Sequence, residues 1–532
     1  MTEVVHASDL SDREKRLLFW ASFLSLMAAG VGFSFRVAMG GEYSAEFQLT
    51  NHEVGMIFGA SLWPIAITMI GFSLVVDRTG YKMPMYVAFL LQALSGIGTF
   101  FAGSYGALYG FAICAGLGHG IVEAVINPIC AAVYPKEKTK WLTLLHAAWP
   151  AGLVAGTLAI IWSDGIVGGP EGGSALEMGM AWKYHALWIL FPAVAYVLMY
   201  GPCKFPVDER VQAGVPYKEM LQQVGFLSAF LAFFLVTYEI GNQGQQLEYW
   251  QTGENWFNVS LLIGLGLGAA FGLWVKALGR PLYFLMCLLM IPVATAELGT
   301  DQWIKNLMNP VLADREINAA YALVFSAFIM LIFRVFAGGV LKIFNPPALL
   351  CVSGVFSAIG LFWLSSATGA AIFIAFTLYA IGQTYYWPCV LGFVSERYPR
   401  GGALTLNTVS AIGLLSAGII GGQLLGVAFD KSIHEQVVVS APELTTAASA
   451  DKSFLGMSHE AIMPKEKDEF IAAITDDVER GRITEVYADA SEQAGRDVLL
   501  YAVRFPLILL IVFGAIALWF RSKGGYKPVE LE

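Results

Sequence analysis

Long apolar runs recur along most of the chain, and each has about the length that a helix needs to cross a lipid bilayer. A hydrocarbon core of about 30 Å requires roughly 20 consecutive apolar residues. Because hydrophobic residues make up 57% of the sequence and charged residues only 14%, the class of soluble globular proteins is excluded. The chain is therefore predicted to be an all-α polytopic membrane protein with fourteen transmembrane helices, at about 17–39, 52–76, 83–103, 106–134, 141–163, 183–201, 224–242, 257–277, 280–298, 319–341, 347–366, 369–395, 403–428 and 498–520.

These runs divide the chain into two halves with an extra pair of helices between them. An N-terminal six-helix half is predicted at 1–201, and a cytoplasmic linker follows at 202–222. The inserted transmembrane pair occupies 223–279, and a C-terminal six-helix half occupies 280–532. That half contains a hydrophilic loop at 430–497, whose later part mixes charged and apolar residues at near-helical spacing. This spacing predicts a small exposed helical subdomain.

Lysine and arginine are distributed unevenly among the loops. The loops at 40–51, 104–105, 243–256 and 367–368 contain neither residue, whereas the alternate loops contain Lys82, Lys136, Lys138, Lys140, Lys204, Arg210, Lys218, Lys276, Arg280, Lys342, Arg397, Arg400, Arg521, Lys523 and Lys527. Short loops rich in these residues stay in the cytoplasm. Both termini are therefore predicted to be cytoplasmic and the loop 430–497 external, in a plasma membrane of the bacterial inner-membrane type.

Charge and motifs exclude several other functions. The segment 430–497 carries 15 acidic and 7 basic residues, which accounts for most of the net charge of −9. No basic surface therefore predicts a nucleic-acid partner. The six cysteines form no C-x-x-C pair, so neither a disulfide framework nor a metal cluster is indicated. No P-loop, dinucleotide fingerprint or catalytic motif is present, and we expect no cofactor and no enzymatic activity.

The most polar of the apolar segments runs from Gly116 to Pro150. His119, Glu123 and Asn127 recur at every fourth residue and share one helix face, and His146 and Trp149 open the next apolar run. An ionisable group in hydrocarbon costs at least about 2.5–3.5 kcal/mol and marks a substrate or proton path. We therefore predict Glu123 and His119 as proton-coupling residues, and Asn127, His146 and Trp149 as substrate-binding residues. Structural ion pairing and interior packing are the alternatives.

Other polar residues within the runs are weaker candidates for the site. Arg36 is the only charge deep in the first run, where it can face the interior or extend to the headgroups. Gln383, Tyr386 and Trp387 precede a proline within a helix and suit stacking on a sugar ring, and Asn407 on the next helix adds a second amide. These five residues are predicted to bind substrate, although the aromatic rings can equally pack. For two further acidic residues, an interfacial and a lumenal position are equally compatible with the sequence: Glu297 and Asp301.

The segment Ser73-Leu-Val-Val-Asp77-Arg78-Thr-Gly80-Tyr-Lys82 resembles the loop between helices 2 and 3 of the major facilitator superfamily, G-x-L-x-D-R-x-G-x-K. Ser73 stands in place of the first glycine. The resemblance implies the major facilitator fold. A carboxylate and two cations at a helix end can bridge neighbouring helices, so Asp77, Arg78 and Lys82 are predicted to form a conformational latch.

Three further segments are similar to the fucose–proton symporter group of this family. The first contains Glu123 to Pro128 together with Leu142 to His146. The second is Arg334 to Pro347, and the third contains Trp387-Pro388 together with Gly401 to Asn407. The resemblance implies a proton-coupled sugar symporter working by alternating access across the bilayer. Two features depart from the group: its acidic residue in helix 1 is missing, and the helices at 224–242 and 257–277 are inserted.

Two alternatives to sugar symport remain at this point. An organic-anion transporter could use the guanidinium of Arg36 as its clamp. A non-transporting membrane sensor could bind a sugar and signal through the loop 430–497. Counterflow of labelled substrate in proteoliposomes separates a transporter from a sensor, because a sensor binds without exchanging.

Overall fold

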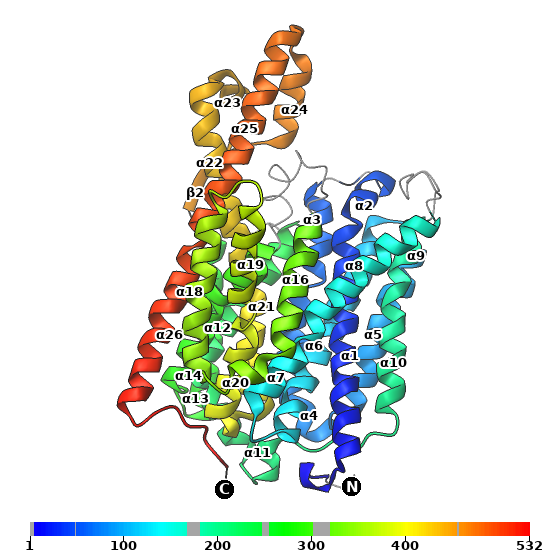
Figure 1. Ribbon diagram of the computed structural model, residues 1–532, viewed down its shortest axis with the longest axis vertical. Helices are drawn as coiled ribbons and strands as arrows, with labels where there is room; N and C mark the ends of the chain where they lie inside the picture. The colour runs from blue at the N-terminus through cyan, green and yellow to red at the C-terminus, as the bar shows by residue number, and fades with distance from the viewer. Residues whose placement is uncertain are drawn as a thin grey trace.

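The computed structural model describes residues 5–47, 49, 51–167, 181–246, 255–301, 320–454 and 457–531. The long helices form one bundle (Figure 1), and both chain termini lie at the same end of it. We call this the terminus end. Helices α23, α24 and part of α25 project beyond the bundle at the opposite end.

The first half consists of long helices that begin and end close to the predicted bounds. Helix α1 begins at the capping box that the sequence predicts: Ser11 accepts a hydrogen bond from the Glu14 amide, and the Ser11 amide donates to the Glu14 carboxylate over 2.9 Å. Several helices are interrupted by a turn, notably at Ala147. The elements are α1 (Asp12–Ala38), α2 (Gly40–Phe47), α3 (Asn51–Ala60), α4 (Trp63–Thr79), α5 (Lys82–Phe101), α6 (Tyr105–Val133), α7 (Lys138–His146), α8 (Ala148–Val167), α9 (Ala181–His185), η3 (Ala186–Ile189) and α10 (Leu190–Tyr200).

The inserted pair is held together by glycines. Helix α11 (Glu209–Gln212) lies in the linker, and α12 (Tyr217–Gln246) is followed by α13 (Trp256–Val275). Gly264, Gly268 and Gly272 of α13 face phenylalanines of α12, so closely that an added Cβ would lie 2.6–2.7 Å from them. This spacing allows close helix approach in a membrane. Helix α12 begins at Tyr217, within the predicted linker 202–222, and is kinked at Gly225, and the domain bounds stay a prediction.

The second half contains two short π-helical turns within its long helices. They are η4 and η6, which pack against each other. An added Cβ on Gly421 of η6 would lie 3.0 Å from Thr295 of η4. Such turns leave backbone groups without their regular partners and are frequent at functional sites. The elements are α14 (Pro281–Ala294), η4 (Thr295–Gly299), α16 (Ala320–Val335), α17 (Ala337–Val340), α18 (Pro346–Leu364), α19 (Ala371–Gln383), α20 (Tyr386–Arg397), η5 (Pro399–Gly401), α21 (Gly402–Ser416), η6 (Ala417–Gly421), α22 (Gly422–Ser440) and α26 (Arg504–Ser522).

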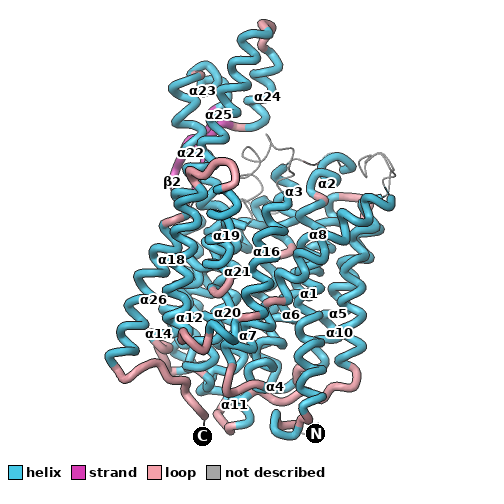
Figure 2. Tube along the Cα trace, in the orientation of Figure 1, coloured by secondary structure: helices cyan, strands magenta, loops and turns pink. Residues whose placement is uncertain are grey.

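The hydrophilic segment 430–497 folds on its own small core at the end opposite the termini. It contains the end of α22, then α23 (Pro442–Ala448), the antiparallel strands β1 (Ser449–Phe454) and β2 (Met457–Ile462), α24 (Pro464–Ala473) and the first part of α25 (Asp477–Ala502) (Figure 2). Its core consists of small and branched apolar side chains, among them Val437, Leu444, Ile483 and Ala490. The predicted helices are confirmed, whereas the sequence did not predict the hairpin.

The described residues contain eleven helices that are long and apolar enough to cross a membrane. The other three predicted runs, 183–201, 319–341 and 369–395, hold shorter or interrupted helices, and residue 319 lies outside the described residues. The fold is thus an all-α polytopic membrane fold, and the count of fourteen crossings stays a prediction. The two halves meet where α16 packs on α7 and α8, and where α21 packs on α4 and α6.

The arrangement of the two ends makes a prediction about topology. Because 430–497 lies opposite both termini, reporter fusions after residue 210 and at the C-terminus should read cytoplasmic, and a fusion at 460 should read external. Alkaline phosphatase and green fluorescent protein fusions measure this. A cytoplasmic signal at 460 would contradict the predicted membrane topology.

Candidate functional site

The predicted residues of the first half form one buried cluster. Glu123 Oε2 accepts a hydrogen bond from Asn127 Nδ2 over 2.7 Å, and Asn127 Oδ1 lies 3.0 Å from His146 Nε2. Because the carboxylate fixes the orientation of the amide, His146 Nε2 is the donor to Asn127. His119 Nε2 lies 3.7 Å from Glu123 Oε1, and the His119 ring stacks on Trp149 with centroids 5.2 Å apart. The structure thus brings all five side chains together, from α6, α7 and α8.

The carboxylate of this cluster is buried, and no lysine or arginine of the described residues pairs with it. Glu123 is 5% exposed and Asn127 is fully buried. The ionisable partners around Glu123 are two imidazoles, His119 and His146. An unpaired buried charge costs several kcal/mol, so the charge of the cluster is balanced only when a proton is shared among these groups. The cluster can therefore gain or lose a proton together with a change in its surroundings.

A second buried cluster lies in the other half and centres on Arg334 of α16, which is 2% exposed. Its Nη2 donates to Glu297 Oε1 over 2.8 Å, its Nε to the Thr384 carbonyl over 2.8 Å, and its Nη1 to the His146 carbonyl over 2.9 Å. His146 ends α7 and Thr384 follows α19, so both carbonyls lie at helix interruptions. Arg334 therefore satisfies backbone groups that the broken helices leave free.

Asp301 and Gln383 extend this second cluster. Gln383 Nε2 donates to Ser326 Oγ over 2.8 Å and to Asp301 Oδ1 over 3.3 Å. Within the described part of the chain, Gln383 Oε1 and Glu297 Oε2 have no hydrogen-bond partner. Arg334 pairs with Glu297 only, and Asp301 is bonded to the Gln383 amide, so among its described residues the cluster carries one more acidic than basic group. It too can take up a proton or another cation.

His146 connects the two clusters. Its side chain bonds Asn127 of the first half, and its carbonyl accepts from Arg334 of the second. Asn407 makes a second link between the halves, because its Nδ2 donates to Ser73 Oγ over 2.7 Å and to the Ala124 carbonyl over 3.0 Å. Ala124 is the neighbour of Glu123. A separation of the halves at this level must break both links.

The predicted aromatic residues of α20 lie apart from the first cluster. Tyr386 is fully buried, and its hydroxyl donates over 3.5 Å to the Ser353 carbonyl of α18. Trp387 packs on α21, where an added Cβ on Gly413 would lie 2.7 Å from its ring. Both rings therefore serve as packing in this state, and a sugar-stacking role remains a proposal.

Arg36 is buried in α1, where it is 9% exposed, and its Nε has no hydrogen-bond partner among the described residues. It lies close to Tyr43. Three residues earlier in the same helix, the Phe33 ring contacts Trp149, with centroids 5.3 Å apart. Arg36 therefore lies beyond the histidine–glutamate cluster along α1 and does not extend into solvent.

The predicted latch residues meet the linker at the terminus end. Asp77 forms an ion pair with Arg210, and Lys82 Nζ donates to the carbonyls of Gly201 and Cys203 over 2.7 and 3.3 Å. Arg78 is exposed. The cation that pairs with Asp77 thus comes from the linker and not from the motif itself, which the spacing within the motif did not indicate.

Close to this latch, Asp208 is buried against the second half. Its carboxylate accepts hydrogen bonds from the Tyr81 hydroxyl over 3.3 Å and from the Arg210 amide over 2.8 Å, and it lies against Gly402. Burial raises the pKa of Asp208 to about 6, while the bonds and charge of Arg210 oppose this effect. The latch region therefore contains a group that titrates close to neutral pH.

Sequence reasoning gave no role to Arg334 and left Glu297 and Asp301 undecided. Arg334 is the only charge within the apolar run 319–341 and Glu297 lies close to the end of the run 280–298, and charges in such runs require partners in the bilayer. The presence of two opposite charges in apolar runs could therefore have predicted their ion pair from the sequence. The described residues contain no group of three or more His, Cys, Asp or Glu side chains that could hold a metal ion.

The fold and the two clusters define an integral multi-pass membrane transporter with its polar groups where the halves meet. A family model described as Major Facilitator Superfamily matches residues 18–422. The chain therefore belongs to the Major Facilitator Superfamily, and it is a secondary transporter rather than an enzyme.

Solved structures of the same fold are similar at low identity. A bacterial homologue of the human lysosomal transporter Spinster has a TM-score of 0.57 at 13% identity, covering 98% of this chain and 100% of that chain. The proton:xylose symporter XylE, bound to 6-bromo-6-deoxy-D-glucose, has a TM-score of 0.56 at 14% identity, with 94% and 97% covered. A single-residue variant of the E. coli fucose:proton symporter FucP has a TM-score of 0.54 at 13% identity, with 94% and 98% covered. The comparison with curated proteins found no match.

The contacts of Arg334 predict a large effect on stability. Replacing it in Arg334→Met leaves Glu297 buried and unpaired, so the free energy of unfolding should fall by about 3–5 kcal/mol. Adding Glu297→Gln should restore part of this loss, because the unpaired charge is then removed. Thermal unfolding of the purified protein measures both, with exposed Arg78→Gln as a control of equal charge change. A double variant no more stable than Arg334→Met would contradict the pairing.

The burial of Asp208 predicts a pH dependence. Its pKa is higher in the folded than in the unfolded protein, so the folded state binds this proton more tightly. Its contribution to stability is therefore greatest at low pH and is lost as the pH rises from about 4 to about 6, by on the order of 2–3 kcal/mol. Melting temperatures of the wild type should fall relative to Asp208→Asn over this range. Parallel curves would contradict the assignment.

Proposed function

We propose that the protein is a proton-coupled sugar symporter that works by alternating access. It would lie in a membrane of the bacterial inner-membrane type, with both termini on the cytoplasmic side. The main support for the proposal is the buried cluster around Glu123. A buried carboxylate hydrogen-bonded to an amide and flanked by two histidines combines a proton-binding group with hydrogen-bonding groups for hydroxyls. The fold is shared with a proton:xylose and a fucose:proton symporter, which supports this substrate class.

The ionised Glu123 carboxylate and the substrate would compete for the hydrogen bonds of Asn127. Asn127 bonds Glu123 through its Nδ2 and His146 through its Oδ1, so both polar atoms of the amide are engaged. A sugar hydroxyl that bonds Asn127 must displace one of these partners. Protonation of Glu123 removes the negative charge that holds the amide, so loading of the proton would favour loading of the sugar.

Arg334 would transmit this change to the other half. It holds the His146 carbonyl and the Glu297 carboxylate at the same time, and His146 is bonded to Asn127. Movement of His146 when substrate binds would therefore alter the contact that joins the halves. Asn407, bonded beside Glu123, would be released in the same step. Such coupling of a local bond to a two-state arrangement is what alternating access requires.

A second candidate, an organic-anion transporter, is favoured by one observation. Arg36 is buried with an unpaired Nε among the described residues, and a guanidinium in this condition suits a carboxylate or phosphate ligand. It lies beyond the Trp149 ring along α1. A neutral sugar would have no use for this charge, so substitution of Arg36 separates the two candidates.

The proposal predicts the behaviour of Glu123→Gln. The amide side chain resembles the protonated acid, so substrate exchange should continue while uphill, pH-driven uptake is abolished. Counterflow and accumulation of labelled sugar in proteoliposomes measure the two activities separately. Glu239→Gln is the matched control, because Glu239 is also a buried carboxylate hydrogen-bonded to an amide, that of Gln243 in the inserted pair.

The control should keep pH-driven accumulation. Accumulation against a gradient by Glu123→Gln would place the coupled proton elsewhere, and loss of accumulation in both variants would show an effect that is not specific to the cluster. A protein that binds sugar but shows no counterflow in any variant would be a sensor.

Three substitutions distinguish the substrate classes. An unpaired buried amide partner costs about 1–3 kcal/mol, so Asn127→Ala should weaken sugar binding roughly ten- to a hundredfold. Trp387→Ala should have a similar effect that falls mainly on ring-shaped substrates. Arg36→Gln should be mild for a sugar and severe for an anion. Thermal-shift titrations with monosaccharides, disaccharides and small organic acids measure these affinities, and near-normal sugar affinity in both Asn127→Ala and Trp387→Ala would contradict the placement of the site.

A further inference from the structure

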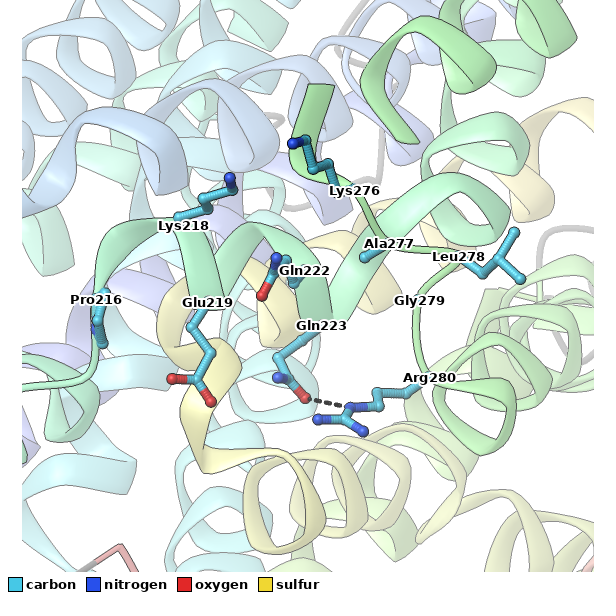
Figure 3. A pocket seen from close by; sticks show the side chains of 10 residues that line it. All are labelled: Pro216, Lys218, Glu219, Gln222, Gln223, Lys276, Ala277, Leu278, Gly279 and Arg280. Atoms are coloured by element: carbon cyan, nitrogen blue, oxygen red, sulfur yellow. Dashed lines mark hydrogen bonds between the residues drawn. The ribbon is translucent and has the colours of Figure 1, made fainter. Parts of the chain in front are cut away.

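A cavity of about 500 Å³ lies where the linker meets the inserted helix pair (Figure 3), and the residues that line it belong to neither buried cluster. It is formed by the start of α12 and by the turn between α13 and α14. Basic and amide side chains dominate its lining, which consists of Pro216, Lys218, Glu219, Gln222, Gln223, Lys276, Ala277, Leu278, Gly279 and Arg280.

The walls of this cavity are fixed by backbone contacts. Gly225 and Gly279 have φ angles of 55° and 94°, and an added Cβ on Gly225 would lie 2.1 Å from the Gly279 nitrogen. Glycine is therefore required where the kink of α12 meets the turn. The Phe226 amide donates to the Ala277 carbonyl over 3.0 Å, and the Arg280 amide to the Gln223 carbonyl over 3.2 Å. These contacts fix the backbone of the two segments that carry the lining side chains.

Three cations surround the cavity, and its one acid is engaged elsewhere. Glu219 accepts a hydrogen bond from Arg400 over 2.5 Å. Within the described ranges, Lys218 and Lys276 form no ion pair, and Arg280 donates its Nε to Gln223. Figure 3 shows Lys218 and Lys276 on one side of the cavity and Arg280 on the other. The arrangement presents positive charge from two sides to one open cavity.

The conformation of Lys276 supports a specific role. It adopts φ 58° and ψ 47° at the end of α13, the left-handed region in which glycine is the usual residue at a helix end. Among the described residues, Lys276 is the only non-glycine residue with a positive φ. A lysine here costs backbone strain that a glycine would avoid, and strained side chains of this kind gather at ligand sites.

Next to the cavity, the surface is strongly apolar. Leu273, Trp274 and Leu278 are 78%, 66% and 70% exposed. Leu273 and Trp274 lie on the outer face of α13, away from the glycines that contact α12, and Leu278 lies in the turn that follows α13; these exposed apolar side chains thus face the bilayer. Tryptophan is enriched where a membrane protein crosses the headgroup level. The cavity therefore opens at the boundary between headgroups and acyl chains.

We propose that this cavity binds the headgroup of an anionic phospholipid. Its phosphate lies between Lys218, Lys276 and Arg280, and its acyl chains lie along the exposed side chains of α13. The charge recognises phosphate, and the neighbouring apolar surface favours a lipid over a soluble phosphate ester. Basic pockets between membrane helices recognise anionic lipids by this chemistry. The lipid joins the inserted pair to the second half of the transporter at the terminus end.

Native mass spectrometry of the full-length protein in detergent tests the proposal, with palmitoyl-oleoyl phosphatidylglycerol as the probe and phosphatidylcholine of the same acyl chains as the neutral comparison. The wild type should retain phosphatidylglycerol preferentially. Each basic residue removed should weaken this binding about fivefold, so K218Q/K276Q/R280Q should weaken it about a hundredfold. The control R521Q/K523Q/K527Q changes charge equally at the same end and should have little effect.

Lys276→Gly provides a second test that does not depend on the triple variant folding. It should weaken phosphatidylglycerol binding about fivefold and yet raise the melting temperature of the lipid-free protein, because glycine relieves the strained φ. If Lys276 had only a structural role, its replacement would not weaken lipid binding while raising the melting temperature.

Several results would overturn the proposal. They are equal retention of the two lipids by the wild type, equal loss of phosphatidylglycerol binding in the triple variant and its control, and unchanged lipid binding by Lys276→Gly. Competition by soluble glycerol 3-phosphate at concentrations similar to those of the lipid would identify a site for a free phosphate ester instead, and would equally overturn it.

Discussion

One buried guanidinium holds together the irregular parts of this transporter. Arg334 bonds the carbonyl that ends α7, the carbonyl that follows α19, and a carboxylate in the π-helical turn η4. Without Arg334, each of the two carbonyls would be an unsatisfied polar group in a membrane interior, where such a group costs several kcal/mol. A single side chain with five donors in a planar fork can satisfy all three at once. The broken helices therefore depend on Arg334, and Arg334 depends on Glu297 for charge balance.

This dependence links the two halves and gives each a different chemistry. The first half supplies a carboxylate whose neighbours are imidazoles and an amide, while the second supplies a carboxylate paired with an arginine and another bonded to an amide. His146 belongs to both networks, by its side chain and by its carbonyl. At the terminus end, Thr139 Oγ1 donates to Glu396 over 2.5 Å and Lys138 Nζ donates to the Ser395 carbonyl over 3.3 Å. The halves are therefore joined at two levels, which describes a transporter closed toward its termini.

The sequence predicts those parts of the fold and site that depend on local pattern. Apolar run length identifies the helices, and fourth-residue spacing brings His119, Glu123 and Asn127 onto one face. It does not predict contacts that require tertiary placement. Arg334 and Glu297 are far apart in the chain, so only their shared unsuitability for hydrocarbon connects them. The partner of Asp77, the hairpin at 449–462 and the packed position of Tyr386 likewise depend on neighbours that local pattern does not specify.

Arg334 is central to this arrangement, because it bonds the His146 carbonyl of the first half from the second half and so keeps the two halves together. Double electron–electron resonance distances between spin labels at Lys136→Cys and Lys342→Cys, in a protein without its six native cysteines, test this claim most directly. These exposed positions belong to opposite halves. If Arg334 has this role, one short distance is expected in the otherwise unchanged protein, and an added population at longer distance is expected in Arg334→Gln. An identical distance distribution in the two proteins would contradict it.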